Sequence, residues 1–272
     1  MSEFTVKKLK GAEPYLEKVA LEIRYRDGYS YLDNCGKLLN TIFAKYPEWS
    51  IDSKDPNPQS ANLFSFENGA TLVVNTRHLV LSLEKPVEGD SLKSDDLQVF
   101  KEQVESVVRL AIDLLGITER ERVGCRAWYL FPFDSEEACQ QWIQKLGLVS
   151  VPPSICSSFD GTLSACGVAL VLESEDGFKY RIACNGSERN SRLDIGGRSM
   201  MLRESKLQPS RQELLEKMKQ KRRISANAGP FPAMIDIDVF KEPGSDRDLD
   251  LIVDKAAKES YQRVVNFVRG KK

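Results

Sequence analysis

Two aspartates one residue apart, Asp236 and Asp238, lie in the stretch MIDIDVF. A metal-dependent nuclease or phosphotransferase places carboxylates around its cation in this way. In MIDIDVF, however, apolar residues alternate with the aspartates, and this alternation is typical of a half-buried strand. A cation site would need more oxygen ligands at the same point, and the sequence offers only Glu84 and Glu173 for this. We therefore expect solvated, ion-paired aspartates on a strand, with a metal site as the alternative.

Cationic side chains on other predicted strands could pair with these aspartates. In VALEIRYRD and RVGCRAW, the alternation places arginines on the face away from the core. Lys179 and Arg181 occupy the same phase in a later strand. Cross-strand pairs of opposite charge contribute about 0.2 to 1 kcal/mol each. The candidate binding residues on this open sheet face are therefore Arg24, Arg26, Arg126, Trp128, Asp236 and Asp238.

Other residue types that could carry out chemistry are few. The single histidine, His78, lies in TRHLVLSLE, where the pattern predicts the start of a strand or a turn. The six cysteines form no C-x-x-C pair, so we expect reduced and mostly buried thiols. The sequence thus identifies no catalytic residue, no dedicated metal site and no cofactor.

The length and the hydropathy of the chain limit its class. At 272 residues it can form one large domain or two small ones. Residues 1–30 lack the apolar core of a signal peptide, and no apolar run approaches the ~18 residues that cross a bilayer. We expect a cytoplasmic protein without a membrane span.

Hydrophobic periodicity predicts the elements of the first half of the chain. A strand over 19–27 precedes a helix over 31–46, whose apolar stripe begins at Leu32. Three strands follow within 62–85, with a hairpin turn at Asn68-Gly69. A long helix over 97–115, capped by Asp95 or Asp96, ends at Gly116.

The second half repeats this order of elements. A strand over 122–133 leads to a short helix that begins with a capping box from Asp134 to Glu137. A hairpin over 166–185 turns at Asp176-Gly177, and it is followed by a strand over 233–242 and a long helix over 249–268. The sequence predicts an α+β protein of two duplicated strand-helix-three-strand-helix units, 1–116 and 117–272. Their strands would form a curved antiparallel sheet with both long helices on one face.

Two resemblances accompany these patterns. The stretches LEIRYRD, RVGCRAW and MIDIDVF resemble the recurring strands of a sporadically distributed bacterial family of about this length, which has no assigned activity. That resemblance covers most of the chain and implies no catalytic residue. The duplicated order of elements also resembles the saddle of TATA-binding-protein-like folds, a likeness that implies a topology but not a function.

The two halves differ by a basic insertion at 186–231. It contains eleven Lys and Arg against five Asp and Glu, so it carries a charge of +6, whereas the whole chain carries −1. A short helix is predicted within it, because Ser210 and Glu213 have capping-box spacing. Its candidate binding residues, which would contact nucleic acid or another polyanion, are Lys217, Lys219, Lys221, Arg222 and Arg223.

These observations favour a non-enzymatic binding or adaptor protein. It would hold a macromolecular partner, in the first place a protein, through its sheet face or its basic insertion. The alternative is a metal-dependent enzyme that acts on nucleic acid or nucleotides through Asp236 and Asp238.

Overall fold

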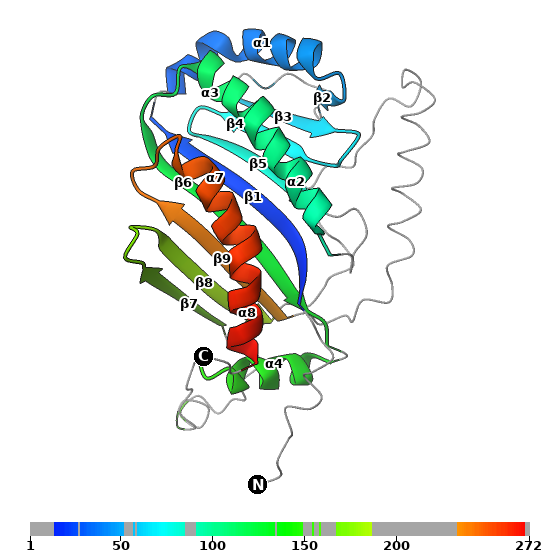
Figure 1. Ribbon diagram of the computed structural model, residues 1–272, viewed down its shortest axis with the longest axis vertical. Helices are drawn as coiled ribbons and strands as arrows, with labels where there is room; N and C mark the ends of the chain where they lie inside the picture. The colour runs from blue at the N-terminus through cyan, green and yellow to red at the C-terminus, as the bar shows by residue number, and fades with distance from the viewer. Residues whose placement is uncertain are drawn as a thin grey trace.

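The protein is an α+β protein whose described strands form one open antiparallel sheet of nine strands (Figure 1). The computed structural model describes residues 14–26, 28–51, 59–84, 91–133, 135–148, 167–186 and 233–269, together with residues 57, 154 and 158.

The elements follow the predicted order in both halves of the chain. The first half contains β1 (Tyr15–Tyr25), α1 (Gly28–Lys45), β2 (Trp49–Ile51), β3 (Ser60–Ser65), β4 (Thr71–Asn75), β5 (His78–Glu84), and one long helix made of α2 (Ser94–Gln103), the π-helical segment η2 (Val104–Val108) and α3 (Arg109–Leu115). The second half contains β6 (Arg120–Phe131), α4 (Glu136–Lys145), β7 (Gly167–Glu173), β8 (Lys179–Gly186), β9 (Ala233–Lys241), and a long helix made of α7 (Asp248–Val253), the π-helical segment η4 (Asp254–Glu259) and α8 (Ser260–Val268).

The strand order is the same on both sides of the sheet centre. The sheet runs β2-β3-β4-β5-β1-β6-β9-β8-β7, so β1 and β6 pair in the middle. Outward from β1 lie β5, β4 and β3, and outward from β6 lie β9, β8 and β7. Each half therefore contributes its first strand to the centre and places its hairpin farther out, and β2 adds a further edge strand in the first half.

Both long helices pack on one face of the sheet, as Figure 1 shows. The strands present alternate apolar residues to them, such as Leu21 and Ile23 of β1, which are fully buried. The Tyr129 hydroxyl of β6 donates a hydrogen bond to the carbonyl oxygen of Ala256 at 2.8 Å, which fixes η4 over the sheet. An ion pair of 2.6 Å between Lys101 and Asp254 joins the two long helices. The other face of the sheet lies opposite this helix layer.

The hairpin turns form as the sequence predicts. Gly69 and Gly177 have φ values of 78° and 76°, which glycine adopts without the steric cost that a side chain would bring. His78 begins β5, and Cys35, Cys125, Cys139 and Cys184 carry reduced thiols. Cys156 and Cys166 lie outside the described residues.

Several local predictions are wrong. Leu32 is 42% exposed, because α1 begins at Gly28 and buries Tyr31, Leu38 and Ile42 instead. The cap of α4 is Ser135, whose hydroxyl accepts a hydrogen bond from the Ala138 N–H.

The ends of two other elements also differ from the prediction. The long helix begins at Ser94, so Asp95 and Asp96 lie in its first turn. The Asp96 carboxylate nevertheless caps this end, because it accepts a hydrogen bond from the Lys93 N–H at 2.8 Å. Strand β2 was not predicted, because three residues are too few to show an alternation of apolar and polar side chains. Among the described helices, none is long and apolar enough to span a membrane.

Candidate functional site

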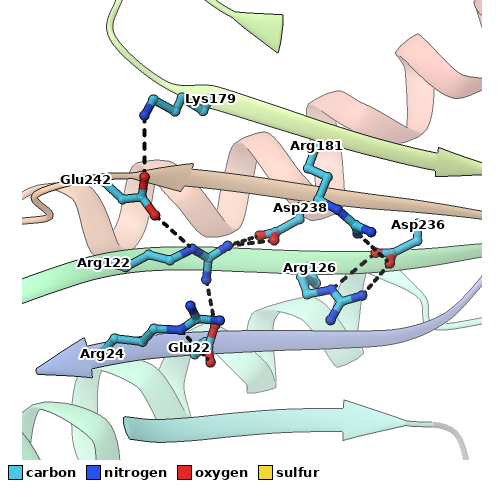
Figure 2. Close-up of polar contacts among 9 residues, drawn as sticks. All are labelled: Glu22, Arg24, Arg122, Arg126, Lys179, Arg181, Asp236, Asp238 and Glu242. Atoms are coloured by element: carbon cyan, nitrogen blue, oxygen red, sulfur yellow. Dashed lines mark hydrogen bonds and ion pairs between the residues drawn. The ribbon is translucent and has the colours of Figure 1, made fainter. Parts of the chain in front are cut away.

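The open face of the sheet carries a group of charged side chains from four adjacent strands, β1, β6, β9 and β8 (Figure 2). The pairing register sets Gly124 opposite Glu22 and Phe240, and it sets Arg126 opposite Asp238. Since side chains alternate along a strand, residues of this parity share the face away from the helices. Figure 2 draws five cationic and four anionic side chains: Glu22, Arg24, Arg122, Arg126, Lys179, Arg181, Asp236, Asp238 and Glu242.

Arg122 lies at the centre of the larger set of contacts. Its Nη2 is 2.6 Å from both carboxylate oxygens of Asp238, and its Nη1 is 2.6 Å from Oε2 of Glu22. The Nε atom lies 3.8 Å from Oε1 of Glu242. The Arg122 side chain is only 6% exposed, so these contacts replace the water that a guanidinium would otherwise hold.

Gly124 leaves space for this guanidinium, and the ring of Phe240 packs against it. A Cβ atom at Gly124 would lie 2.8 Å from both terminal nitrogens of Arg122 and 2.8 Å from Cβ of Phe240. The Phe240 ring centroid is 4.5 Å from Cζ of Arg122, a cation–π distance. Gly124 thus allows Arg122 to extend along its own strand toward the neighbouring carboxylates.

Asp236 and Asp238 are ion-paired, as predicted, but they are not solvated. Their exposed fractions are 3% and 7%, because flanking side chains of neighbouring strands enclose them. Burial raises the pKa of Asp238 above its usual value, while Arg122 and Arg126 favour its charged form. Because these ion pairs are buried, the loss of one partner would leave an uncompensated charge and lower the stability of the folded protein.

Asp236 holds the second set of contacts. Arg126 donates to it through two nitrogens: Nε is 3.3 Å from Oδ1, and Nη2 contacts Oδ2. Nη1 of Arg181, on β8, is 3.6 Å from Oδ2 of Asp236. One buried carboxylate thus orients two guanidinium groups whose side chains remain 37% and 40% exposed.

A shallow concavity of about 480 Å³ adjoins these two arginines. Trp128 contributes to its wall, and Cζ of Arg126 lies 4.8 Å from the Trp128 ring centroid. Nζ of Lys18 lies 5.6 Å from the same ring. The amide of Asn185 adds a further polar group to the lining. The arrangement combines excess positive charge, a half-buried aromatic ring and a hollow on the sheet surface.

Arg24 and Arg26 lie at the margin of the site. Arg24 pairs with Glu22 at 3.1 Å and is 52% exposed, so it borders the Arg122 contacts. Arg26 lies beyond the end of β1, and its contact is Glu121 at 2.5 Å. The strand ends at Tyr25 with a register shift, so Arg26 lies outside the strand that was predicted to carry it, and its place on the open face stays a prediction.

The metal hypothesis needs the carboxylates of Asp236 and Asp238 to be free to bind a cation. In the structure, arginine side chains already pair with both carboxylates. Among the described residues, no group of three or more His, Cys, Asp and Glu side chains could hold a metal ion. A cation at Asp236 or Asp238 would first have to displace a guanidinium.

The basic insertion lies outside the described residues. Strand β8 ends at Gly186, the first residue of the predicted insertion, and the sheet resumes with β9 at Ala233. The candidate residues Lys217, Lys219, Lys221, Arg222 and Arg223 all fall in that part of the chain, so their role stays a prediction.

Sequence reasoning missed three members of the site, Glu22, Arg122 and Glu242. Arg122 has the same parity as Arg126 in RVGCRAW, with a glycine between them, so an arginine-glycine-arginine alternation was a readable signal. Glu22 alternates with Leu21 and Ile23 in VALEIRYRD, so the sequence indicates its outward face but not its partner. Glu242 is the last residue of the strand predicted over 233–242 and has the parity of Asp236 and Asp238, so its direction was readable, although β9 itself ends at Lys241.

Comparison with known proteins gives no relative from which to infer a function. No known protein family matches the sequence, and no curated protein matches it. The predicted bacterial family and the TATA-binding-protein-like likeness stay resemblances of short strands and topology.

Proposed function

We propose that the protein is a non-enzymatic binding protein, and that it holds an acidic segment of a partner protein at the concavity beside Arg126 and Arg181. The observation that carries this proposal is the sharing of one buried carboxylate, Asp236, by two half-exposed guanidinium groups. The cluster has one positive charge in excess, and its unused N–H groups are available for a carboxylate from outside.

The geometry of Asp236 favours recognition over simple stabilisation of the fold. A surface ion pair contributes little to stability, because two flexible side chains must be held in one place. Here the carboxylate is buried and fixed, so Arg126 is already oriented before a ligand arrives. Such preorganisation lowers the entropic cost of binding.

Trp128 and the hollow supply the remaining features of a binding surface. Tryptophan and arginine are the residues that most often dominate binding energy at protein interfaces. The concavity of about 480 Å³ is large enough for one or two side chains of a partner.

A long polyanion is a poorer fit to this face than a short acidic segment. Glu242 is 42% exposed and Glu84 is 29% exposed on the same face, so a nucleic acid lying across the sheet would meet like charges. The metal-dependent alternative would need Asp236 and Asp238 free of their arginines, which the described contacts do not favour.

Calorimetric titration with a glutamate-rich peptide tests the proposal. The wild type should bind the peptide at low salt, and added salt should weaken the binding because the contact is electrostatic. Arg181→Gln should reduce the affinity several-fold. Arg24→Gln is the matched control, because Arg24 is also exposed on this face but does not line the concavity.

Three results would contradict the proposal. One is the absence of binding heat at low salt, and another is equal affinity in the Arg181→Gln variant. The third is a duplex oligonucleotide that binds more tightly than the peptide and is insensitive to Arg181→Gln, which would favour the basic insertion as the contact.

We also infer that the two halves, 1–116 and 117–272, arose by duplication and together make a saddle-like sheet. The matching strand order outward from β1 and β6, together with the matching hairpin turns, supports this inference. Separate expression of the two halves is a direct test: co-expressed halves should assemble through β1 and β6, and failure to assemble would weaken the inference.

A further inference from the structure

Strand β7 is an exposed edge of the sheet with an apolar sequence, GVALVLE. It pairs only with β8 among the described strands, so one of its two hydrogen-bonding edges has no neighbour there. Val171 is 61% exposed and Leu172 is 51% exposed. Because they lie on opposite faces of the strand, β7 presents apolar side chains on both sides.

Edge strands usually carry features that prevent pairing with other chains. Charged side chains, prolines, bulges and short lengths are the common devices. At the other end of the sheet, β2 has only three residues. By contrast, β7 has seven residues in continuous register with β8, and its one charged residue, Glu173, lies at its end.

The sequence of β7 is suited to antiparallel pairing with itself. In the register that overlaps all seven residues, Leu170 lies opposite Leu170 of the second copy. Val168 then faces Leu172, and Ala169 faces Val171. Glu173 faces Gly167, so no two like charges are opposed.

We propose that β7 pairs with β7 of a second copy of this chain, so that the two sheets join into one across a twofold axis at Leu170. A contact in which each copy uses the same surface closes on itself and yields a dimer rather than a fibre. A seven-residue strand pair is a small interface, so the dimer should dissociate on dilution.

This dimer would also connect the two candidate sites, although it does not depend on the proposed function. Val168 and Ala169 of β7 line the concavity that contains Arg181. Pairing through β7 would therefore place the two concavities on adjacent sides of the twofold axis.

Sedimentation of the purified full chain over a range of concentrations tests the proposal. The wild type should double its apparent mass as concentration rises. Leu170→Lys places two like charges directly opposite each other, so dimerisation should weaken by about tenfold or more. Leu170→Glu should do the same. An equimolar mixture of the two variants should recover the dimer, because the opposed charges are then complementary.

The control is Ile51→Lys on β2, which is an exposed apolar position on the opposite edge. It should leave the apparent mass unchanged. A wild type that stays monomeric at every concentration would overturn the proposal. So would a mixture of Leu170→Lys and Leu170→Glu that stays monomeric when the wild type dimerises. Circular dichroism should show that both variants are folded, since Leu170 is already 38% exposed.

Discussion

The guanidinium group of Arg122 lies over Gly124, two residues along the same strand, in the space that a side chain at position 124 would need. From this position Arg122 reaches Glu22 on β1 and Asp238 on β9, the two strands that flank β6. The centre of the sheet is thus joined on its open face by one buried cation, in addition to the backbone hydrogen bonds.

Replacement of Gly124 by alanine should destabilise the protein. The new Cβ would lie 2.8 Å from the Arg122 nitrogens and from Cβ of Phe240, so the guanidinium or the strand must shift. Overpacking of this kind costs about 1 to 3 kcal/mol in the free energy of unfolding, which urea denaturation measures.

Gly36→Ala is the matched control for this substitution. Gly36 lies inside α1, where an added Cβ atom would meet no heavy atom within 4 Å outside the backbone of its own helix. Alanine there should therefore stabilise the helix by about 0.5 to 1 kcal/mol. If both variants have the same stability, the close contact at Gly124 does not constrain the sheet.

Replacement of Arg122 by methionine should lower the free energy of unfolding more than replacement of Arg24, an exposed arginine that pairs with the same Glu22. Removal of one partner from a buried ion pair costs about 3 to 5 kcal/mol, because the other charge is left buried. Arg24→Met removes an exposed cation that contacts the same Glu22, and it should cost at most about 1 kcal/mol. Equal effects in urea denaturation would contradict the central role of Arg122.

The decrease in the free energy of unfolding caused by Arg122→Met should depend on pH. Burial already raises the pKa of Asp238, and without Arg122 this pKa should rise further. The folded-state pKa exceeds the unfolded value of about 3.9 in the wild type and should exceed it by more in the variant, so the native state of the variant should bind the proton more tightly. The resulting stability is present below about pH 3.9 and is lost as pH rises through the folded pKa.

The difference in unfolding free energy between wild type and Arg122→Met should therefore grow as pH rises from the folded-state pKa of Asp238 in the wild type toward its higher pKa in the variant. Addition of Asp238→Asn to this variant removes the titrating group, so it should flatten the pH dependence and recover stability at neutral pH. A difference that stays constant with pH in both variants would show that Asp238 is not the responsible carboxylate.

The sequence predicted the sheet well because its signals are local. Alternation in MIDIDVF placed Asp236 and Asp238 on one face, and the Asn68-Gly69 and Asp176-Gly177 turns set the hairpins. The strand order was beyond the sequence, since pairing between β1 and β6 joins residues about a hundred positions apart.

Burial of the site could not be predicted in the same way. A charged residue in an alternating strand normally indicates a solvated face. Asp238 is buried beside Arg122, Gly124 and Phe240, and that arrangement depends on the register between β6 and β9. The end of β1 was not predictable either, since the alternation continues in the sequence to Arg26 whereas the strand ends at Tyr25.

Fluorescence of Trp128 during titration with the glutamate-rich peptide is the most direct test of the proposed binding site. Trp49 and Trp142 are buried in the core, whereas Trp128 lines the concavity beside Arg126. The peptide should change the tryptophan emission of the wild type at low salt, and Trp128→Phe should abolish that change. Peptide binding that leaves the emission unchanged, or an emission change that persists in Trp128→Phe, would place the contact elsewhere and contradict the proposed site.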